Sequence, residues 1–301
     1  MNETNDIEKT TKDHAQTVAI VTDSVAQVPA EIARQLDITV IPFTLNINGR
    51  SYLDGADLAP TELYRRMRME TIIPTTAGPS LGQYQEVFRA RLQAGAQAVL
   101  CVVLSKNLSS SYNIACLAAK QVLADFPECA IEVLDSQKVT IAQGFIAIAA
   151  ARAAAEGKSL AEVLQVAREV MPHTGIAATL ETLEYLERGG RIGKAAYMLG
   201  SLIDIKPVLM IDEQGKVSPI RKVRGENRAL QAIMDQVQQL VNGSQHIYLA
   251  ILEADAPERA ARLEELVLQK LQPLKIFHSE LTPVMGVHTG PGVIGLAYCY
   301  E

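Results

Sequence analysis

Two segments of the sequence place hydroxyl side chains just before predicted helices. Ile73–Ser80 (IPTTAGPS) contains Thr76, and Leu104–Ala115 (LSKNLSSSYNIA) contains a run of three serines that begins at Ser109. Hydroxyl groups and the free backbone N–H groups of a helix N-terminus can together bind a carboxylate or a phosphate. The same residue types are also common helix caps. Each segment alone therefore leaves both an anion-binding role and a capping role open.

A third polar segment ends the first apolar run of the chain. Val21–Ser24 (VTDS) finishes on Asp23 and Ser24. In open α/β folds, ligands bind at the carboxyl edge of the sheet, where such side chains lie. The alternative is that Asp23 caps the helix that follows. The sequence leaves these two roles equally open.

Three arginines and one histidine complete the set of candidate residues. Leu186–Lys194 (LERGGRIGK) carries Arg188 and Arg191 around two glycines, which predicts a mobile cationic turn. Arg224 precedes a predicted helix in KVRGENRA, and His288 precedes a Gly-Pro-Gly turn in VHTGPGVIG. Glycines next to a histidine allow a ligand to approach closely. A solvated turn, a solvated helix start and a structural histidine remain the alternatives.

Several function classes lack their signatures. The chain has neither the GxxxxGK[ST] of a P-loop nor the GxSxG of a nucleophile elbow, and its four cysteines form no CxxC pair or metal-ligand spacing. A formal net charge of −6 argues against broad binding of nucleic acid or anionic membranes. One candidate function remains open at this point, a serine-dependent acyl-ester hydrolase. In it Ser109 would be the nucleophile and His288 the base that a serine nucleophile needs nearby. A second alternative is a triose kinase-like subunit, which would need a substrate-binding histidine in a motif of its own. A third is a pure protein-interaction module, which would be purified without a bound lipid.

Strands alternate with helices from Thr17 to Pro172, which predicts a mainly parallel sheet between helical layers. After Pro172, paired strands predict a mixed sheet. We therefore expect an α/β protein with two domains, 17–172 and 173–301, and a ligand site at their interface. Within these domains we expect one strand region over Ile38–Gly49 and a Gly-rich turn with a closing strand after Val287.

The ends and the hydropathy of the chain bear on where the protein works. Residues 1–16 are polar, lack the apolar core of a secretory signal and are expected to form a disordered tail. The sequence contains no stretch of about 18 apolar residues, which is the length needed to cross a membrane. The cysteines fit small buried side chains in a reducing compartment. We therefore expect a soluble, cytoplasmic protein.

Taken in order, these segments resemble the DegV family, from Val18 to about Tyr298. The resemblance rests on nine motifs: VTDS, IPF, TTAGPS, LSSSYNIA, LDS, LERGGRIGK, KPVL, KVRG and HTGPG. It implies two α/β domains that hold one long-chain fatty acid in a tunnel between them. It also implies a protein that is not an enzyme by itself. Such a protein is the acyl-binding subunit of a bacterial fatty acid kinase, which presents the carboxylate to a separate ATP-binding subunit that makes acyl-phosphate for phospholipid synthesis.

The resemblance also assigns residues. It implies that Thr76 and Ser109 contact the fatty-acid carboxylate and that His288 is linked to it through a polar network. The arginines of the ERGGR-like and KVRG-like segments, which are Arg188, Arg191 and Arg224, would contact the kinase partner or move with a lid. Asp23 and Ser24 are further candidates for head-group or partner contacts. No cofactor and no metal are implied, and we expect a monomer.

This chain departs from the family pattern close to both head-group residues. The family's serine after the threonine is Ala77 here, and Gly78 replaces a common glutamine. The family's Gly-Thr after the serine is Ser110–Ser111. These changes affect the expected geometry of the head-group site, while Thr76 and Ser109 themselves are retained.

Overall fold

The computed structural model describes residues 17–70, 72–200 and 205–301, so the tail predicted over residues 1–16 lies outside the described residues. A four-stranded parallel sheet occupies the first half of the chain, in the order β2-β1-β6-β7. Its strands are β1 (Val18–Asp23), β2 (Ile38–Ile41), β6 (Ala98–Val103) and β7 (Ala130–Asp135). Every residue of β1 and β6 is buried, because both faces of the sheet are covered.

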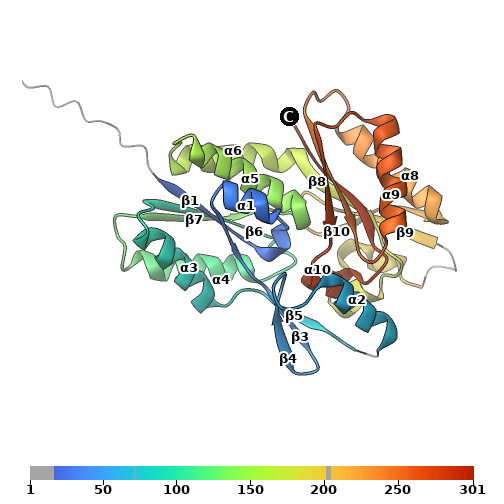
Figure 1. Ribbon diagram of the computed structural model, residues 1–301, viewed down its shortest axis with the longest axis horizontal. Helices are drawn as coiled ribbons and strands as arrows, with labels where there is room; N and C mark the ends of the chain where they lie inside the picture. The colour runs from blue at the N-terminus through green and yellow to red at the C-terminus, as the bar shows by residue number, and fades with distance from the viewer. Residues whose placement is uncertain (1–16, 71, 201–204) are drawn as a thin grey trace, which may run out of the picture.

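Helices cover both faces of the parallel sheet (Figure 1). On one face lie α3 (Leu81–Gln93) and α4 (Ser111–Leu123). On the other lie α1 (Ala30–Gln35), α5 (Thr140–Ala155) and α6 (Leu160–Val170). The predicted α/β/α layering is confirmed.

A six-stranded mixed sheet occupies the second half, in the order β10-β9-β8-β13-β11-β12. Its strands are β8 (Thr174–Thr179), β9 (Ile205–Ile211), β10 (Val217–Arg224), β11 (Ile247–Glu253), β12 (Lys275–Glu280) and β13 (Ile294–Tyr300). Strands β11 and β12 are parallel, and the other described neighbours are antiparallel. Helices α8 (Glu226–Leu240) and α9 (Pro257–Lys270) pack on one face. The predicted mixed sheet is confirmed, whereas the division into domains at 172–173 stays a prediction.

Helix α5 lies between the two large sheets. Most of its residues are buried, and its Phe145 packs against Phe277 of β12 with ring centroids 6.0 Å apart. A helix that is apolar all round is stable only when it is enclosed. The Ala-rich sequence of α5 is therefore explained by its enclosed position, where the helix packs between the parallel sheet and the mixed sheet.

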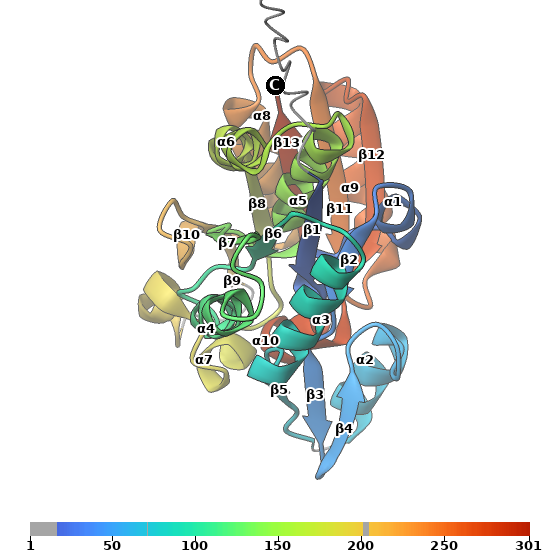
Figure 2. The same ribbon diagram turned by 90° about the vertical axis from the view of Figure 1, so that its left-hand side faces the viewer.

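A small antiparallel sheet, β4-β3-β5, projects from one end of the molecule next to α2 (Pro60–Met69), as Figure 2 shows. Its strands are β3 (Thr44–Ile47), β4 (Arg50–Leu53) and β5 (Thr75–Ala77). The prediction of one strand region over Ile38–Gly49 was wrong, since Pro42 lacks an N–H group and separates β2 from β3. Asn48 and Gly49 both have positive φ and form the predicted turn, now between β3 and β4.

Several short elements connect the larger ones. They are the 3₁₀ helices η1 (Ser24–Ala26), η2 (Met171–His173) and η3 (Gly193–Met198), helix α7 (Glu184–Arg188) and helix α10 (Pro283–Thr289). Of these, η1, α7 and α10 contribute lining residues to the candidate site. The sequence predicted only a turn and a strand after Val287, so α10 is a correction. Tertiary bonds position this seven-residue helix, since Val284 N donates to Asp54 Oδ1 at 3.0 Å and Tyr64 Oη donates to Leu281 O at 2.8 Å just before it.

Candidate functional site

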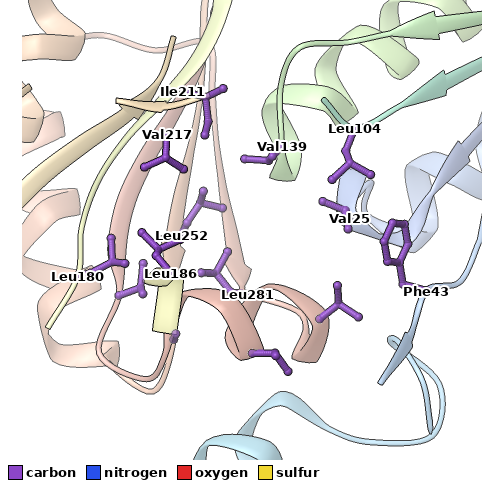
Figure 3. Packing of buried hydrophobic residues seen from close by; sticks show 14 of the residues in the cluster. Val25, Phe43, Leu104, Val139, Leu180, Leu186, Ile211, Val217, Leu252 and Leu281 are labelled. Atoms are coloured by element: carbon purple, nitrogen blue, oxygen red, sulfur yellow. The ribbon is translucent and has the colours of Figure 1, made fainter. Parts of the chain in front are cut away.

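An apolar cavity of about 380 Å³ lies between the parallel and the mixed sheet. In Figure 3, Val25, Leu104 and Val139 face Ile211 and Leu252 across it. Further aliphatic side chains from the mixed sheet and α10 complete the lining: Ile176, Leu180, Leu209, Val217, Val284 and Val293. The cavity therefore fits a ligand with a long hydrocarbon part.

Polar side chains from β5, the β6–α4 loop and α10 line this cavity, and we call this group its polar end; Thr140, next to Val139, is a further polar lining residue. Thr76 of β5, Ser109 of the β6–α4 loop and His288 of α10 all line it. Thr76 Oγ1 lies 2.7 Å from His288 Nε2, which is hydrogen-bonding distance. The structure thus brings together the three residues that the sequence nominated for a carboxylate.

Burial controls the charge of His288. Burial, and to a smaller extent the positive charge of Arg191, lowers the pKa of His288 from 6.5 to about 4. The imidazole is therefore neutral near pH 7. Its Nδ1 atom is buried and has no hydrogen-bond partner among the described residues. A proton on Nε2 would be donated to Thr76 Oγ1 and would leave the Thr76 proton free for a ligand.

Ser109 is held by the start of α4. Its Oγ atom lies 2.9 Å from Ser111 Oγ and accepts a hydrogen bond from Ser111 N at 3.2 Å. Ser109 is therefore paired with Ser111, while His288 is paired with Thr76. This arrangement gives no support to a Ser109–His288 nucleophile and base.

Asp23 and Ser24 lie behind the cavity wall and do not line it. Asp23 Oδ1 accepts from Val25 N at 3.1 Å and its Oδ2 accepts from Leu104 N at 3.2 Å, and both of these donors belong to lining residues. Burial raises the pKa of Asp23 from 3.8 to about 7, against the opposing effect of these bonds. Ser24 Oγ donates to Asp54 Oδ2 at 2.7 Å. Asp23 and Ser24 therefore contribute to the cavity wall indirectly, through hydrogen bonds outside the cavity.

The three candidate arginines lie at different places in the structure. Arg191 lines the cavity at its polar end and donates from Nε to Leu108 O at 3.0 Å. Arg188 is exposed, and its guanidinium lies 5.8 Å from the centre of the Tyr185 ring. Arg224 ends β10 and lines a separate surface hollow with Arg228 and Arg262. The structure therefore brings Arg191 to the site and leaves Arg224 elsewhere.

The polar end is also where the cavity meets the surface. Three lining residues are exposed, namely Ala77, Ser110 and Arg191. Ala77 adjoins Thr76, and Ser110 adjoins Ser109 in the sequence. A carboxylate bound at this end would lie close to solvent and to any docking protein.

Sequence reasoning missed the lining residues of β8, β9 and β13. Aliphatic residues that line a cavity follow the same alternation as residues of a solid core, so no local signal separates them. Gly189 did carry a signal, since it lies in the Gly-Gly turn. A Cβ atom there would be 2.5 Å from His288 Nδ1, so the turn can approach the imidazole only as glycine.

Two other features are absent from residues 17–70, 72–200 and 205–301. No group of three or more His, Cys, Asp or Glu side chains in these ranges could hold a metal ion. No helix within them is both long enough and apolar enough to cross a membrane.

Comparison with known proteins gives consistent matches over the whole described chain. A family model described as "Uncharacterised protein, DegV family" matches residues 17–301. The DegV domain-containing protein of Caldanaerobacter subterraneus subsp. tengcongensis is 31% identical over 281 residues, which cover 93% of this chain and 98% of that protein. A DegV domain-containing protein of Streptomyces coelicolor is 32% identical over 280 residues, covering 93% and 97%.

Solved structures share the fold. A DegV family protein from Thermus thermophilus, described for its fatty acid binding, superposes with a TM-score of 0.88 at 31% identity and covers 95% of this chain and 100% of its own. DegV of Bacillus subtilis, described as a fatty acid binding protein, has a TM-score of 0.83 at 27% identity with coverages of 95% and 100%. A stearic acid-binding protein from Eubacterium ventriosum has a TM-score of 0.83 at 27% identity with coverages of 94% and 98%.

Proposed function

The chain belongs to the DegV family, and on that basis we propose that it binds one long-chain fatty acid in the cavity between its two large sheets. The observation that carries this proposal is an aliphatic cavity with one polar end, made by Thr76, Ser109 and His288. A fatty acid has the same division, since a hydrocarbon chain ends in a single carboxylate. The descriptions of three solved relatives as fatty acid binding or stearic acid-binding proteins support the proposal.

The apolar part of the cavity supplies the affinity. Burial of each CH₂ group contributes about 0.8 kcal/mol, so a chain of about sixteen carbons offers on the order of 10 kcal/mol before costs. Lost translational freedom and chain ordering reduce that sum. The cavity volume of about 380 Å³ lies within the range of roughly 300–1,000 Å³ typical of small-molecule pockets.

The polar end supplies the orientation. A buried carboxylate without partners would be costly, so its oxygens need donors. In our proposal the Thr76 and Ser109 hydroxyls donate to the carboxylate, while neutral His288 holds Thr76 in the donating orientation. Hydrogen bonds to an ionised group are roughly twice as strong as those between neutral groups. This pattern selects a free acid over an ester or an alcohol of the same length.

Native mass spectrometry of the freshly purified protein, followed by lipid extraction, tests the binding. We expect one added mass per chain that corresponds to a single long-chain fatty acid. A ligand-free mass that stays unchanged after incubation with palmitate and oleate would refute the proposal.

We further propose that the protein presents the bound carboxylate to a separate ATP-binding kinase subunit, which phosphorylates it to acyl-phosphate for phospholipid synthesis. The exposure of Ala77, Ser110 and Arg191 around the polar end supports this step, because a partner's active site must reach the carboxylate. Arg191 could neutralise phosphate charge there. A monomer that works in the bacterial cytoplasm fits this role, and four free cysteines suit a reducing compartment.

Reconstitution tests the presentation step. Fatty-acid-loaded protein, the kinase subunit of the same organism and ATP are combined, and acyl-phosphate is trapped with hydroxylamine. We expect product only when both proteins are present. At saturating fatty acid, Arg191→Ala should lower the rate of acyl-phosphate formation, while Arg168→Ala, at an exposed position of α6, serves as the surface control. Absence of acyl-phosphate with the loaded wild-type protein would overturn the kinase role and leave fatty-acid binding standing.

A further inference from the structure

Ser111 occupies a buried position directly behind the candidate head-group serine. It is the first residue of α4, and its side chain is fully buried. Two groups of Ser111 contact Ser109 Oγ, since the backbone N–H donates at 3.2 Å and the hydroxyl lies at 2.9 Å. Ser111 does not line the cavity, so it can act on a ligand only through Ser109.

The number of available protons determines the direction of these bonds. A serine hydroxyl carries one proton and two acceptor lone pairs. If Ser109 gives its proton to a carboxylate, it must accept both contacts from Ser111. Ser111 must then donate its own hydroxyl proton to Ser109, and its oxygen is left free to accept a bond from elsewhere.

Tyr84 of α3 is the neighbouring side chain that can complete this chain of donors. Its hydroxyl is buried, and no described residue meets it at full hydrogen-bond geometry. Burial raises the pKa of Tyr84, so the phenol keeps its proton, and Ser111 is the neighbouring side-chain hydroxyl. A protonated phenol is a hydrogen-bond donor, and the oxygen of Ser111 is the acceptor that we assign to it.

Gly78 places the Thr76 segment over the same hydroxyl. A Cβ atom at Gly78 would lie 2.6 Å from Ser111 Oγ, closer than side chains approach. Gly78 lines the cavity and follows Thr76 by two residues. Ser111 therefore lies beneath the segments that carry both candidate carboxylate donors.

We propose that Ser111 is a positioning residue that, supported by Tyr84, turns the Ser109 hydroxyl proton toward the ligand carboxylate. This inference rests on the proposed binding of a fatty acid at Thr76 and Ser109. It assigns to a serine outside the cavity the role of making Ser109 a donor rather than an acceptor. The consequence is selectivity for an anionic head group.

Paired ligands that differ in the head group test this role. Delipidated wild-type protein, Ser111→Ala, Ser111→Thr, Ser109→Ala and the double variant are titrated with palmitate and with 1-hexadecanol. For Ser111→Ala we expect affinity for palmitate to fall about tenfold, because one hydrogen bond to a charged group is weakened. Affinity for hexadecanol should change less than about twofold. Ser111→Thr keeps the hydroxyl and should restore the selectivity.

A double-mutant cycle shows whether Ser111 acts through Ser109. The double variant should bind palmitate as weakly as Ser109→Ala alone, since Ser111 has nothing left to orient. Additive losses, or equal losses for palmitate and hexadecanol in Ser111→Ala, would refute the proposal.

The tyrosine is tested against a matched buried tyrosine. Tyr84→Phe should lower the palmitate-to-hexadecanol selectivity, whereas Tyr298→Phe, at a buried tyrosine of β13 outside the cavity lining, should leave selectivity unchanged. Equal effects of both variants on selectivity would overturn the role of Tyr84. Failure of the wild-type protein to bind either ligand would instead refute the proposed function itself.

Discussion

The Oγ1 atom of Thr76 lies 2.7 Å from Nε2 of His288, although 212 residues separate the two in the chain. Thr76 comes from the small sheet β4-β3-β5 and His288 from the last turn of α10. Their hydrogen bond therefore joins two short elements that come from opposite halves of the sequence. Both side chains line the cavity and contribute to its polar end.

His288 should make the ligand-free protein sensitive to acid. The pKa of His288 is about 4 when folded and 6.5 when unfolded, so between these values the unfolded chain binds more protons. The free energy of unfolding is therefore lost as pH falls from 6.5 to 4, by about 3 kcal/mol from this one group. Urea unfolding of wild type and His288→Gln should show their difference shrinking by that amount between pH 7 and pH 4.

Bound fatty acid should weaken this acid sensitivity. A carboxylate near the imidazole favours the protonated form and raises its pKa, which narrows the pH window over which stability is lost. Palmitate should therefore reduce the change in this stability difference between pH 7 and pH 4. A difference between wild type and His288→Gln that is independent of pH would contradict this account.

Asp23 should act in the opposite direction. The pKa of Asp23 is about 7 when folded, compared with 3.8 for the unfolded chain, so its contribution is fully present below pH 3.8 and is lost as pH rises through 7. The loss is about 4 kcal/mol. The stability of Asp23→Asn relative to wild type should therefore increase from pH 4 to pH 8 in urea unfolding. A relative stability that falls over this range would show that Asp23 is ionised in the folded protein.

Gly78→Ala should damage the site more than the fold. The new Cβ atom would lie 2.6 Å from Ser111 Oγ, and relief of such overpacking costs about 1–3 kcal/mol. Displacing Ser111 should weaken palmitate binding at least tenfold. Gly82→Ala is the matched control, because its nearest contact is 4.0 Å away and alanine favours a helix by up to about 1 kcal/mol. Equal palmitate affinity of the two variants would contradict the proposed geometry.

Ser80 should act as a helix cap only. It forms a capping box with Gln83 at the start of α3, is exposed and does not line the cavity. Ser80→Ala should lower the free energy of unfolding by about 1 kcal/mol and leave palmitate affinity unchanged. Ser159→Ala, which breaks the same motif with Glu162 on α6, should do the same. Weaker binding by Ser80→Ala alone would move Ser80 into the site.

Local sequence signals predicted the regular elements well. The apolar runs of β1 and β6, Pro60 in the first turn of α2 and the Ser159 cap of α6 are such local signals, because each depends only on neighbouring residues. Strand β5 and helix α10 depend on distant partners instead. Thr76 pairs with Leu45, and Asp54 accepts a bond from the first turn of α10, so neither element has a local signal of its own.

The candidate site shows the same limit. The resemblance to the DegV family, rather than residue type alone, assigned Thr76, Ser109 and His288 to one head group, and all three line the cavity. The same reasoning grouped Arg191 with Arg224, which the fold places in separate hollows. A sequence motif identifies polar residues, whereas the arrangement of the strands determines which of these residues lie close together.

The most direct test of the central claim is a crystal structure of the protein with palmitate bound. The account predicts one acyl chain along the cavity between the sheets, with its carboxylate within hydrogen-bonding distance of Thr76 Oγ1 and Ser109 Oγ. A carboxylate bound out of reach of both Thr76 Oγ1 and Ser109 Oγ, or a cavity left without an acyl chain, would contradict it.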